Sequence, residues 1–130
     1  MKDKMPDIKD LFEPRAVAVI GASQDNSKLG YHVTENIVSG GYRGKVYPIN
    51  PRGGEICGQR VYKSIEDVDD EIDLASIVVP AKFVYEAVKS CARKAVKFAS
   101  IITSGFAEVG NVEEEQKIMG TWIAKLVVKE

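Results

Sequence analysis

Short apolar segments that alternate with helical patterning constrain the fold of this chain more than any other feature of its sequence. Four such segments stand out: Ala16–Ile20, Lys45–Ile49, 74–79 and 98–102. Near-continuous apolar runs of this length are typical of strands buried on both faces, as in a parallel sheet covered by helices. At the C-terminus, Val127 and Val128 leave a fifth strand or a frayed helix end as alternatives.

Helical patterns fill the intervals between these strands. The clearest spans residues 83–95, where one apolar stripe is formed at i, i+4, i+7 and i+11 by Val84, Val88, Cys91 and Ala95. We expect a second helix over about residues 30–39, stopped by Gly40 and Gly41. A short turn of helix is expected over residues 64–68, with Ser64 and Asp67 at capping-box spacing, and a terminal helix from Asn111.

This order of elements predicts an α/β fold with a Rossmann-like, doubly wound and mainly parallel sheet. The 130 residues allow a single domain over 1–130, with residues 1–10 loose and 111–130 as the terminal helix. A separate catalytic domain does not fit in this length. Whether residue 130 is a natural end stays open.

Charge and cysteine usage exclude several classes of function. The formal net charge of -1 gives no global field that attracts nucleic acid or an anionic membrane. No apolar run approaches the ~20 residues of a membrane span, and the charged start is unlike a signal peptide, so we expect a cytoplasmic protein. Cys57 and Cys91 lack the spacing of a disulfide framework or zinc site. The acidic residues of 66–73 are interpreted as a solvated face and not as a metal site.

In an open parallel sheet, ligands bind outside the carboxyl ends of the strands. The first strand is followed by a small, polar loop over residues 21–30, and Lys28 adds a positive charge beside the next helix. Unpaired N–H groups at a helix N-terminus make such a loop suitable for a pyrophosphate. The pattern alone is weak, because many strand-to-helix loops look like this, and neither a Walker A nor a GxGxxG motif is present.

The second strand ends in Asn50-Pro51-Arg52. An acidic residue at this place binds the ribose hydroxyls of NAD, whereas an arginine accommodates a ribose phosphate. NAD is therefore disfavoured, and NADP or coenzyme A is favoured. The alternative is that Arg52 lies on a solvated turn.

The third and fourth strands also end in segments suited to a ligand. Val79-Pro80-Ala81 leaves room at the sheet edge, because a proline at a strand end or first helical turn wastes no needed donor. Ile102-Thr103-Ser104 brings two hydroxyls to the same edge. These hydroxyls either bond a ligand or simply cap and turn the chain.

Four ordered motifs together, LFEPRAVAVIGAS, GGYRGKVYPINPRGGEICGQRVYKSIEDV, IDLASIVVPAKFV and ITSGFAEVG, resemble the coenzyme A-binding domain of NDP-forming acyl-CoA synthetases, including ADP-forming acetate-CoA ligase. The succinyl-CoA synthetase alpha subunit is similar, more distantly. The resemblance covers about residues 11–110 and implies binding of CoA or acyl-CoA.

By position it implies the following contacts: Gly21, Ala22, Ser23, Lys28, Leu29 and Gly30 for the pyrophosphate and adenosine side, Asn50, Pro51 and Arg52 for the nucleotide, Val79, Pro80 and Ala81 along the coenzyme, and Ile102, Thr103 and Ser104 at the pantetheine arm. Succinyl-CoA synthetase has an acidic residue in place of Ser104.

The same resemblance implies that this chain is not catalytic alone but is part of an acid-thiol ligase. In that family the catalytic His lies in a flavodoxin-like domain and the nucleotide site in an ATP-grasp domain, and neither fits here. We assign no catalytic role to His32 and no role to Cys57. The alternatives are a stand-alone CoA-binding protein and an NADP-binding oxidoreductase fragment.

Overall fold

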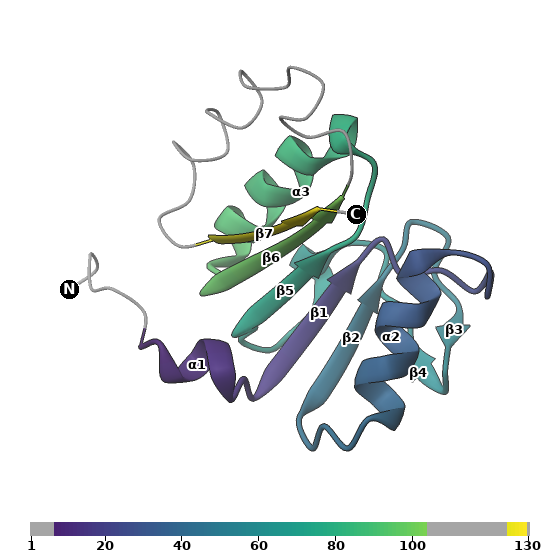
Figure 1. The fold of residues 1–130 in the computed structure, drawn as a ribbon, viewed down its shortest axis with the longest axis horizontal. Coiled ribbons are helices and arrows are strands. Elements are labelled where there is room, and N and C mark those ends of the chain that lie inside the picture. Colours follow the sequence, from purple (N-terminus) through teal and green to yellow (C-terminus); the bar gives the residue numbers. More distant parts are fainter. Residues whose placement is uncertain (1–6, 104–124, 130) are drawn as a thin grey trace.

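A computed structural model describes residues 7–103 and 125–129 of the chain (Figure 1). Its centre is a five-stranded sheet in the order β2-β1-β5-β6-β7. The strands are β1 (Ala16–Ile20), β2 (Lys45–Ile49), β5 (Leu74–Ile77), β6 (Phe98–Thr103) and β7 (Lys125–Lys129). All neighbouring pairs are parallel. Strand order reverses between β1 and β5, which confirms the doubly wound, Rossmann-like α/β prediction.

Helices cover both faces of this sheet. Helix α2 (Leu29–Ser39) lies over one face at β1 and β2, and α3 (Ala81–Lys94) lies behind the sheet (Figure 1). A short helix α1 (Lys9–Phe12) precedes β1, and a 3-10 turn η1 (Ile65–Asp67) precedes β5. A small antiparallel hairpin, β3 (Glu55–Ile56) with β4 (Gln59–Arg60), stands beside the end of β2.

Alternate residues of β1 divide the core between the two helix layers. Ala16 and Ala18 pack in the cluster that contains Val84 and Val88 of α3. Val19 packs in the other cluster, with the residues of α2 and the β3–β4 hairpin. The five named side chains are buried. The sequence analysis explained near-continuous apolar runs by strands that are covered on both faces. The structure confirms this explanation for β1.

Several predicted boundaries shift. β1 and β2 have the predicted bounds, but β5 ends at Ile77, where the Val78 N–H donates to the Ile20 oxygen (2.7 Å) and the chain turns towards the next helix. The predicted place of Ala95 in the apolar stripe is wrong, since it caps α3 in the left-handed region (φ 63°) and is exposed. The Ser64 hydroxyl accepts from the Glu66 N–H instead of completing the predicted pair with Asp67.

Two elements were not predicted at all. Helix α1 begins within the segment expected to be loose and extends past it to Phe12, and the β3–β4 hairpin follows the second predicted strand. At the C-terminus, β7 confirms the strand alternative for residues 127 and 128. Of the terminal helix expected over residues 111–130, the part up to residue 124 lies outside the described residues, and residues 125–129 form the strand β7.

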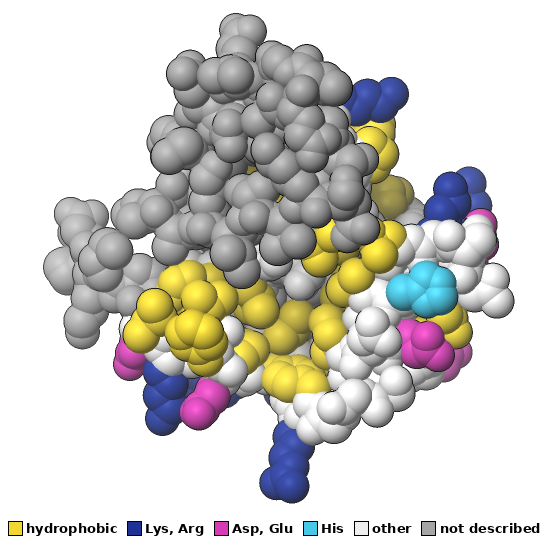
Figure 2. Space-filling view, viewed as in Figure 1, with side chains coloured by type: hydrophobic (Ala, Val, Ile, Leu, Met, Phe, Trp, Pro, Cys, Tyr) yellow, Lys and Arg dark blue, Asp and Glu magenta, His cyan; other side chains and the backbone are white. Residues whose placement is uncertain are grey.

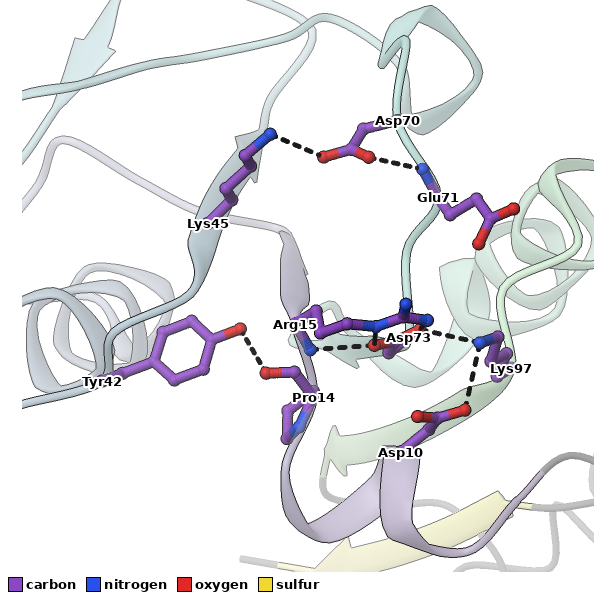
Figure 3. A network of polar contacts seen from close by, with 9 residues as sticks. All are labelled: Asp10, Pro14, Arg15, Tyr42, Lys45, Asp70, Glu71, Asp73 and Lys97. Atoms are coloured by element: carbon purple, nitrogen blue, oxygen red, sulfur yellow. Dashed lines mark hydrogen bonds and ion pairs between the residues drawn. The ribbon is translucent and has the colours of Figure 1, made fainter.

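A network of ion pairs lies at the amino ends of the central strands (Figure 3). The Asp73 carboxylate is 1% exposed and accepts from the backbone N–H of Arg15 (2.8 Å) and from its guanidinium (3.2 Å). The Lys97 Nζ lies 3.1 Å from the Asp73 Oδ1 and 3.0 Å from the Asp10 Oδ2 of α1. The expectation of a wholly solvated acidic face is therefore wrong for Asp73. A charge this deeply buried needs such partners, because burial alone disfavours the ionised form.

Within the described ranges, no helix has the length and apolar character needed to cross a membrane.

Candidate ligand-binding site

Two glycines allow three segments to meet at the carboxyl end of β1. Gly21 has φ +94°, and a Cβ there would stand 2.0 Å from the Val78 oxygen. A Cβ on Gly30, at the start of α2, would stand 2.0 Å from the Gly21 oxygen. Only glycine fits both places, because no L side chain has room at such distances. The end of β5, the loop after β1 and the first turn of α2 are thereby brought into direct backbone contact.

The loop after β1 is shaped by its own short polar side chains. The Ser23 hydroxyl accepts from the Asp25 N–H (3.0 Å), and the Asp25 carboxylate accepts from the Ser27 N–H (2.9 Å) and hydroxyl (2.7 Å). These bonds from Ser27, with a smaller effect of the Lys28 charge, lower the pKa of Asp25 below its ordinary value. The loop is thus a sequence of Asx- and Ser-type turns that leads directly into α2.

The first turn of α2 offers free donors. Lys28 is its N-cap and makes no side-chain capping bond. Among the described residues, no acceptor is found for the N–H groups of Leu29 and Gly30. Unpaired N–H groups and the positive end of the helix dipole favour an anion at this place.

Asn50 connects the end of β2 to this loop. Its amide nitrogen donates to the Ala22 oxygen (2.7 Å), while its amide oxygen accepts from the Arg52 N–H (2.8 Å). The Gly53 N–H donates to the Asn50 backbone oxygen (2.9 Å) and closes a tight turn. The exposed Arg52 side chain therefore projects from a turn whose position is fixed, and it makes no ion pair with any described residue.

Two adjoining cavities lie at this edge and share Ser23, Lys28 and Asn50. The larger, about 750 Å³, is lined mostly by residues with polar side chains: Ser23, Gln24, Asp25, Lys28, Asn50 and Arg52, with Pro51, Gly53 and Ile56. The smaller, about 400 Å³, is lined by Gly21, Ala22, Ser23, Lys28, Leu29, Gly30, Asn50, Val78, Val79, Pro80 and Ile102. Because they share these three residues, the two cavities form one continuous site with a more polar and a more apolar part.

Twelve of the predicted site residues line one or both cavities: Gly21, Ala22, Ser23, Lys28, Leu29, Gly30, Asn50, Pro51, Arg52, Val79, Pro80 and Ile102. Ala81 begins α3 and is not among the lining residues. Thr103 is the last residue of β6, and Ser104 lies outside the described residues.

Sequence reasoning missed five lining residues: Gln24, Asp25, Gly53, Ile56 and Val78. Gln24 has a clear structural task, since its amide donates to the Glu55 oxygen (2.9 Å) and joins the loop to the β3–β4 hairpin. Four of the five could have been found from their place in the sequence, because each directly adjoins a predicted site residue or lies between two of them. Ile56 alone depends on the hairpin, which was not predicted.

Among the described residues, His32 and Cys57 line neither of the two cavities. His32 is exposed, with its ring edge-on to Tyr31 at 5.6 Å. Cys57 adopts φ 53° and is half-buried. The charge of Glu35 and, after it, the contact with Cys57 raise the pKa of Tyr31. Within the described part of the chain, no three His, Cys, Asp or Glu side chains gather as a metal site would need.

Comparison with known proteins gives a consistent result. A family model described as "CoA binding domain" matches residues 15–120. Acetate--CoA ligase [ADP-forming] I subunit alpha from Pyrococcus furiosus is 49% identical over 115 residues, which are 85% of this chain and 24% of that protein. Acetate--CoA ligase [ADP-forming] from Methanocaldococcus jannaschii is 49% identical over 112 residues, 86% of this chain and 16% of that protein.

Among solved structures, an acetyl-coenzyme A synthetase from Ca. Korarchaeum cryptofilum, in complex with phosphate and ADP, superposes with a TM-score of 0.85 at 46% identity. That match covers 88% of this chain and 25% of the synthetase chain. The chain thus spans a quarter or less of the length of these relatives.

Proposed function

Because the chain belongs to the CoA binding domain family, we propose that it binds coenzyme A in the two adjoining cavities as one part of an ADP-forming acyl-CoA synthetase. Its relatives carry this domain in much longer ligase chains. The chain's contribution is then to hold the coenzyme so that its thiol is presented for acyl transfer.

One observation carries the assignment of the ligand: two cations line the larger cavity without an ion pair to any described residue. These are Lys28, beside the free N–H groups of α2, and Arg52, on the turn after β2. Coenzyme A brings a pyrophosphate and a separate ribose phosphate. Placing the pyrophosphate at the helix N-terminus and the ribose phosphate at Arg52 satisfies both groups.

The change of polarity along the site supports an orientation for the ligand. The polar cavity suits the nucleotide, and the smaller cavity, with Val79, Pro80 and Ile102, suits the pantetheine arm. This orientation directs the thiol towards the carboxyl end of β6. The predicted contacts of Ala81, Thr103 and Ser104 stay predictions.

The described residues orient the ligand and supply no nucleophile or general base at the apolar end of the site. We therefore propose that the acyl-phosphate chemistry belongs to other parts of the synthetase, a flavodoxin-like domain with the catalytic His and an ATP-grasp domain. These partners, and the cytoplasmic location, follow from the resemblance and from sequence composition. The domain's own work is binding and positioning, which lowers the entropic cost of bringing the thiol to the acyl donor.

Calorimetric titration of the 130-residue chain with CoA, dephospho-CoA, NADPH and NAD tests the proposal. CoA should bind most tightly. Arg52→Ala should weaken CoA by about 10- to 100-fold, the effect of a lost charge-assisted bond, and should leave dephospho-CoA nearly unchanged. Arg43→Ala, an exposed arginine that lines neither cavity, is the matched control.

Two other outcomes would redirect the assignment. Tight NADPH binding without any response to CoA would favour an oxidoreductase fragment, because Arg52 suits any ribose phosphate. Equal losses for CoA and dephospho-CoA would remove the 3'-phosphate contact from Arg52. A stand-alone CoA-binding protein would bind CoA in the same way but would show no coupling to any synthetase domain.

A further inference from the structure

The short helix α1 presents two large apolar side chains to solvent. Ile8, at its N-cap, is 62% exposed, and Phe12, four residues later, is 75% exposed. Residues spaced by four lie on the same face of a helix. Figure 2 shows hydrophobic side chains gathered over α1, beside the apolar floor that extends towards α2. We call Ile8 and Phe12 the α1 ridge.

The ridge is held in place by charge and not by burial. Helix α1 contains no buried residue. Its Asp10 instead bonds Lys97 (3.0 Å), which also pairs with the buried Asp73 (3.1 Å), and Asp73 in turn holds Arg15 (Figure 3). Tyr42 adds a hydrogen bond to the Pro14 oxygen (2.7 Å). A four-residue helix without a buried residue is not stable by itself, so these polar contacts, which we call the clamp, are what fix the ridge.

The ligand site does not explain the ridge. Arg15, Asp73 and Lys97 directly precede β1, β5 and β6, so the clamp is at the amino ends of the parallel strands. Both cavities open at the carboxyl ends. The family match also begins at residue 15, after α1. Helix α1 therefore precedes the residues that the family model matches, and it lies at the opposite end of the strands from the two cavities.

We propose that the α1 ridge docks into an apolar surface of the synthetase outside the matched domain. This inference rests on the proposed function, that the chain is one part of a larger ligase. The relatives devote about three quarters or more of their length to other parts, and these must pack against this domain somewhere. Two exposed apolar side chains, fixed by an ion-pair network around the buried Asp73, form a preorganised anchor, which reduces the entropic cost of association.

Hydrogen exchange on a chimera tests the docking. The M. jannaschii acetate–CoA ligase would carry this chain in place of its matching 112 residues. The backbone amides of Leu11, Phe12 and Glu13 should then exchange at least ~10-fold more slowly in the chimera than in the free 130-residue chain. Ile8→Ser with Phe12→Ser should abolish that difference. Phe83→Ser, at a side chain that is 52% exposed on α3, should leave it intact.

Two controls keep the outcome interpretable. The double variant of the free chain should unfold within about 4 °C of the parent, because both side chains are exposed. CoA titration of the same chimera reports on the proposed function separately, so protected α1 amides without CoA binding would refute that function and leave the docking in place.

Equal exchange of the α1 amides in the chimera and the free chain would overturn the proposal. So would sedimentation of the free chain as a dimer with protected α1 amides, which would assign the ridge to a second copy.

Discussion

Replacing Gly30 by alanine sets two effects of opposite sign against each other. Gly30 lies in the first turn of α2, and alanine is favoured over glycine in helices by about 1 kcal/mol. If the new methyl group had room, the variant would be more stable than the parent. The structure shows no room: the Cβ would stand 2.0 Å from the Gly21 oxygen, 3.0 Å from the Gly21 carbonyl carbon and 3.3 Å from the Ala22 Cα.

The clash should win because every obstructing atom is backbone. Ordinary van der Waals contact begins at 3.4 Å, so α2 or the Gly21 loop must move by more than about 1 Å. Overpacking of this kind costs about 1–3 kcal/mol. We place Gly30→Ala near the upper end because no flexible side chain can yield. After the helical gain is subtracted, the expected net loss in unfolding free energy is about 1–2 kcal/mol.

The same displacement should weaken CoA binding. A shift of about 1 Å stretches an N–H···O bond from about 2.9 Å to nearly 4 Å, where it no longer counts as a hydrogen bond. Loss of one charge-assisted bond at the Leu29 or Gly30 N–H corresponds to about 10- to 100-fold in affinity. Dephospho-CoA should lose affinity equally, which distinguishes this variant from Arg52→Ala.

Urea unfolding and calorimetric titration measure both effects. His32→Ala is the matched control on the same helix, because His32 is exposed and should gain a few tenths of a kcal/mol from helix propensity without affecting CoA. A Gly30→Ala variant that is stabilised by about 0.5–1 kcal/mol and binds CoA normally would refute the reasoning. The close contact between the first turn of α2 and Gly21 would then be free to relax.

Three further predictions concern other parts of the molecule. Burial raises the pKa of Asp73, but the side-chain and backbone bonds from Arg15 and those from Lys97 outweigh it, so the net pKa lies below its usual value. The stabilisation is therefore present at neutral pH and lost as the pH falls below about 4. Asp73→Asn should cost about 1.5–3 kcal/mol at pH 7 in urea unfolding, and this difference should shrink at acid pH unless the clamp is unimportant. Ala95→Gly should stabilise by about 0.5–1 kcal/mol, because glycine tolerates the left-handed cap; destabilisation in calorimetry would contradict this. Burial raises the pKa of Cys91 to about 12, so iodoacetamide at pH 8 should leave it unmodified in the folded protein, as peptide mass spectrometry can show.

Strands that are buried on both faces were predictable from the sequence, because such burial requires apolar residues at successive positions. β1 has this burial and the predicted bounds, whereas β2 also has the predicted bounds although Lys45 is exposed and only Pro48 and Ile49 are buried. The β3–β4 hairpin was not predictable in this way, since each strand has only two residues and no periodicity can be seen over that length. Helix α1 was missed because ion pairs with residues distant in sequence hold it, such as Asp10 with Lys97.

The candidate site was predicted well where sequence order and spatial order coincide. The loops after β1 and β2 lie at the same sheet edge in any doubly wound fold, which is why Ser23, Lys28 and Arg52 could be grouped. The close contact of Gly21 with Gly30 could not be deduced, because it depends on the approach of α2 to the sheet. The buried role of Asp73 also escaped, since an acidic cluster looks solvated until its partners are located.

The separation of the ion-pair clamp from the ligand cavities has a consequence for protein engineering. Five residues of β1 lie between Arg15 and Gly21, a distance of about 20 Å at ~3.3 Å per residue. Effects of substitutions at that distance add independently. Nucleotide preference can then be redesigned at the carboxyl ends of the strands without disturbing the ion pairs at their amino ends. The loss of unfolding free energy in a double variant such as Asp73→Asn with Arg52→Ala should equal the sum of the losses in the two single variants.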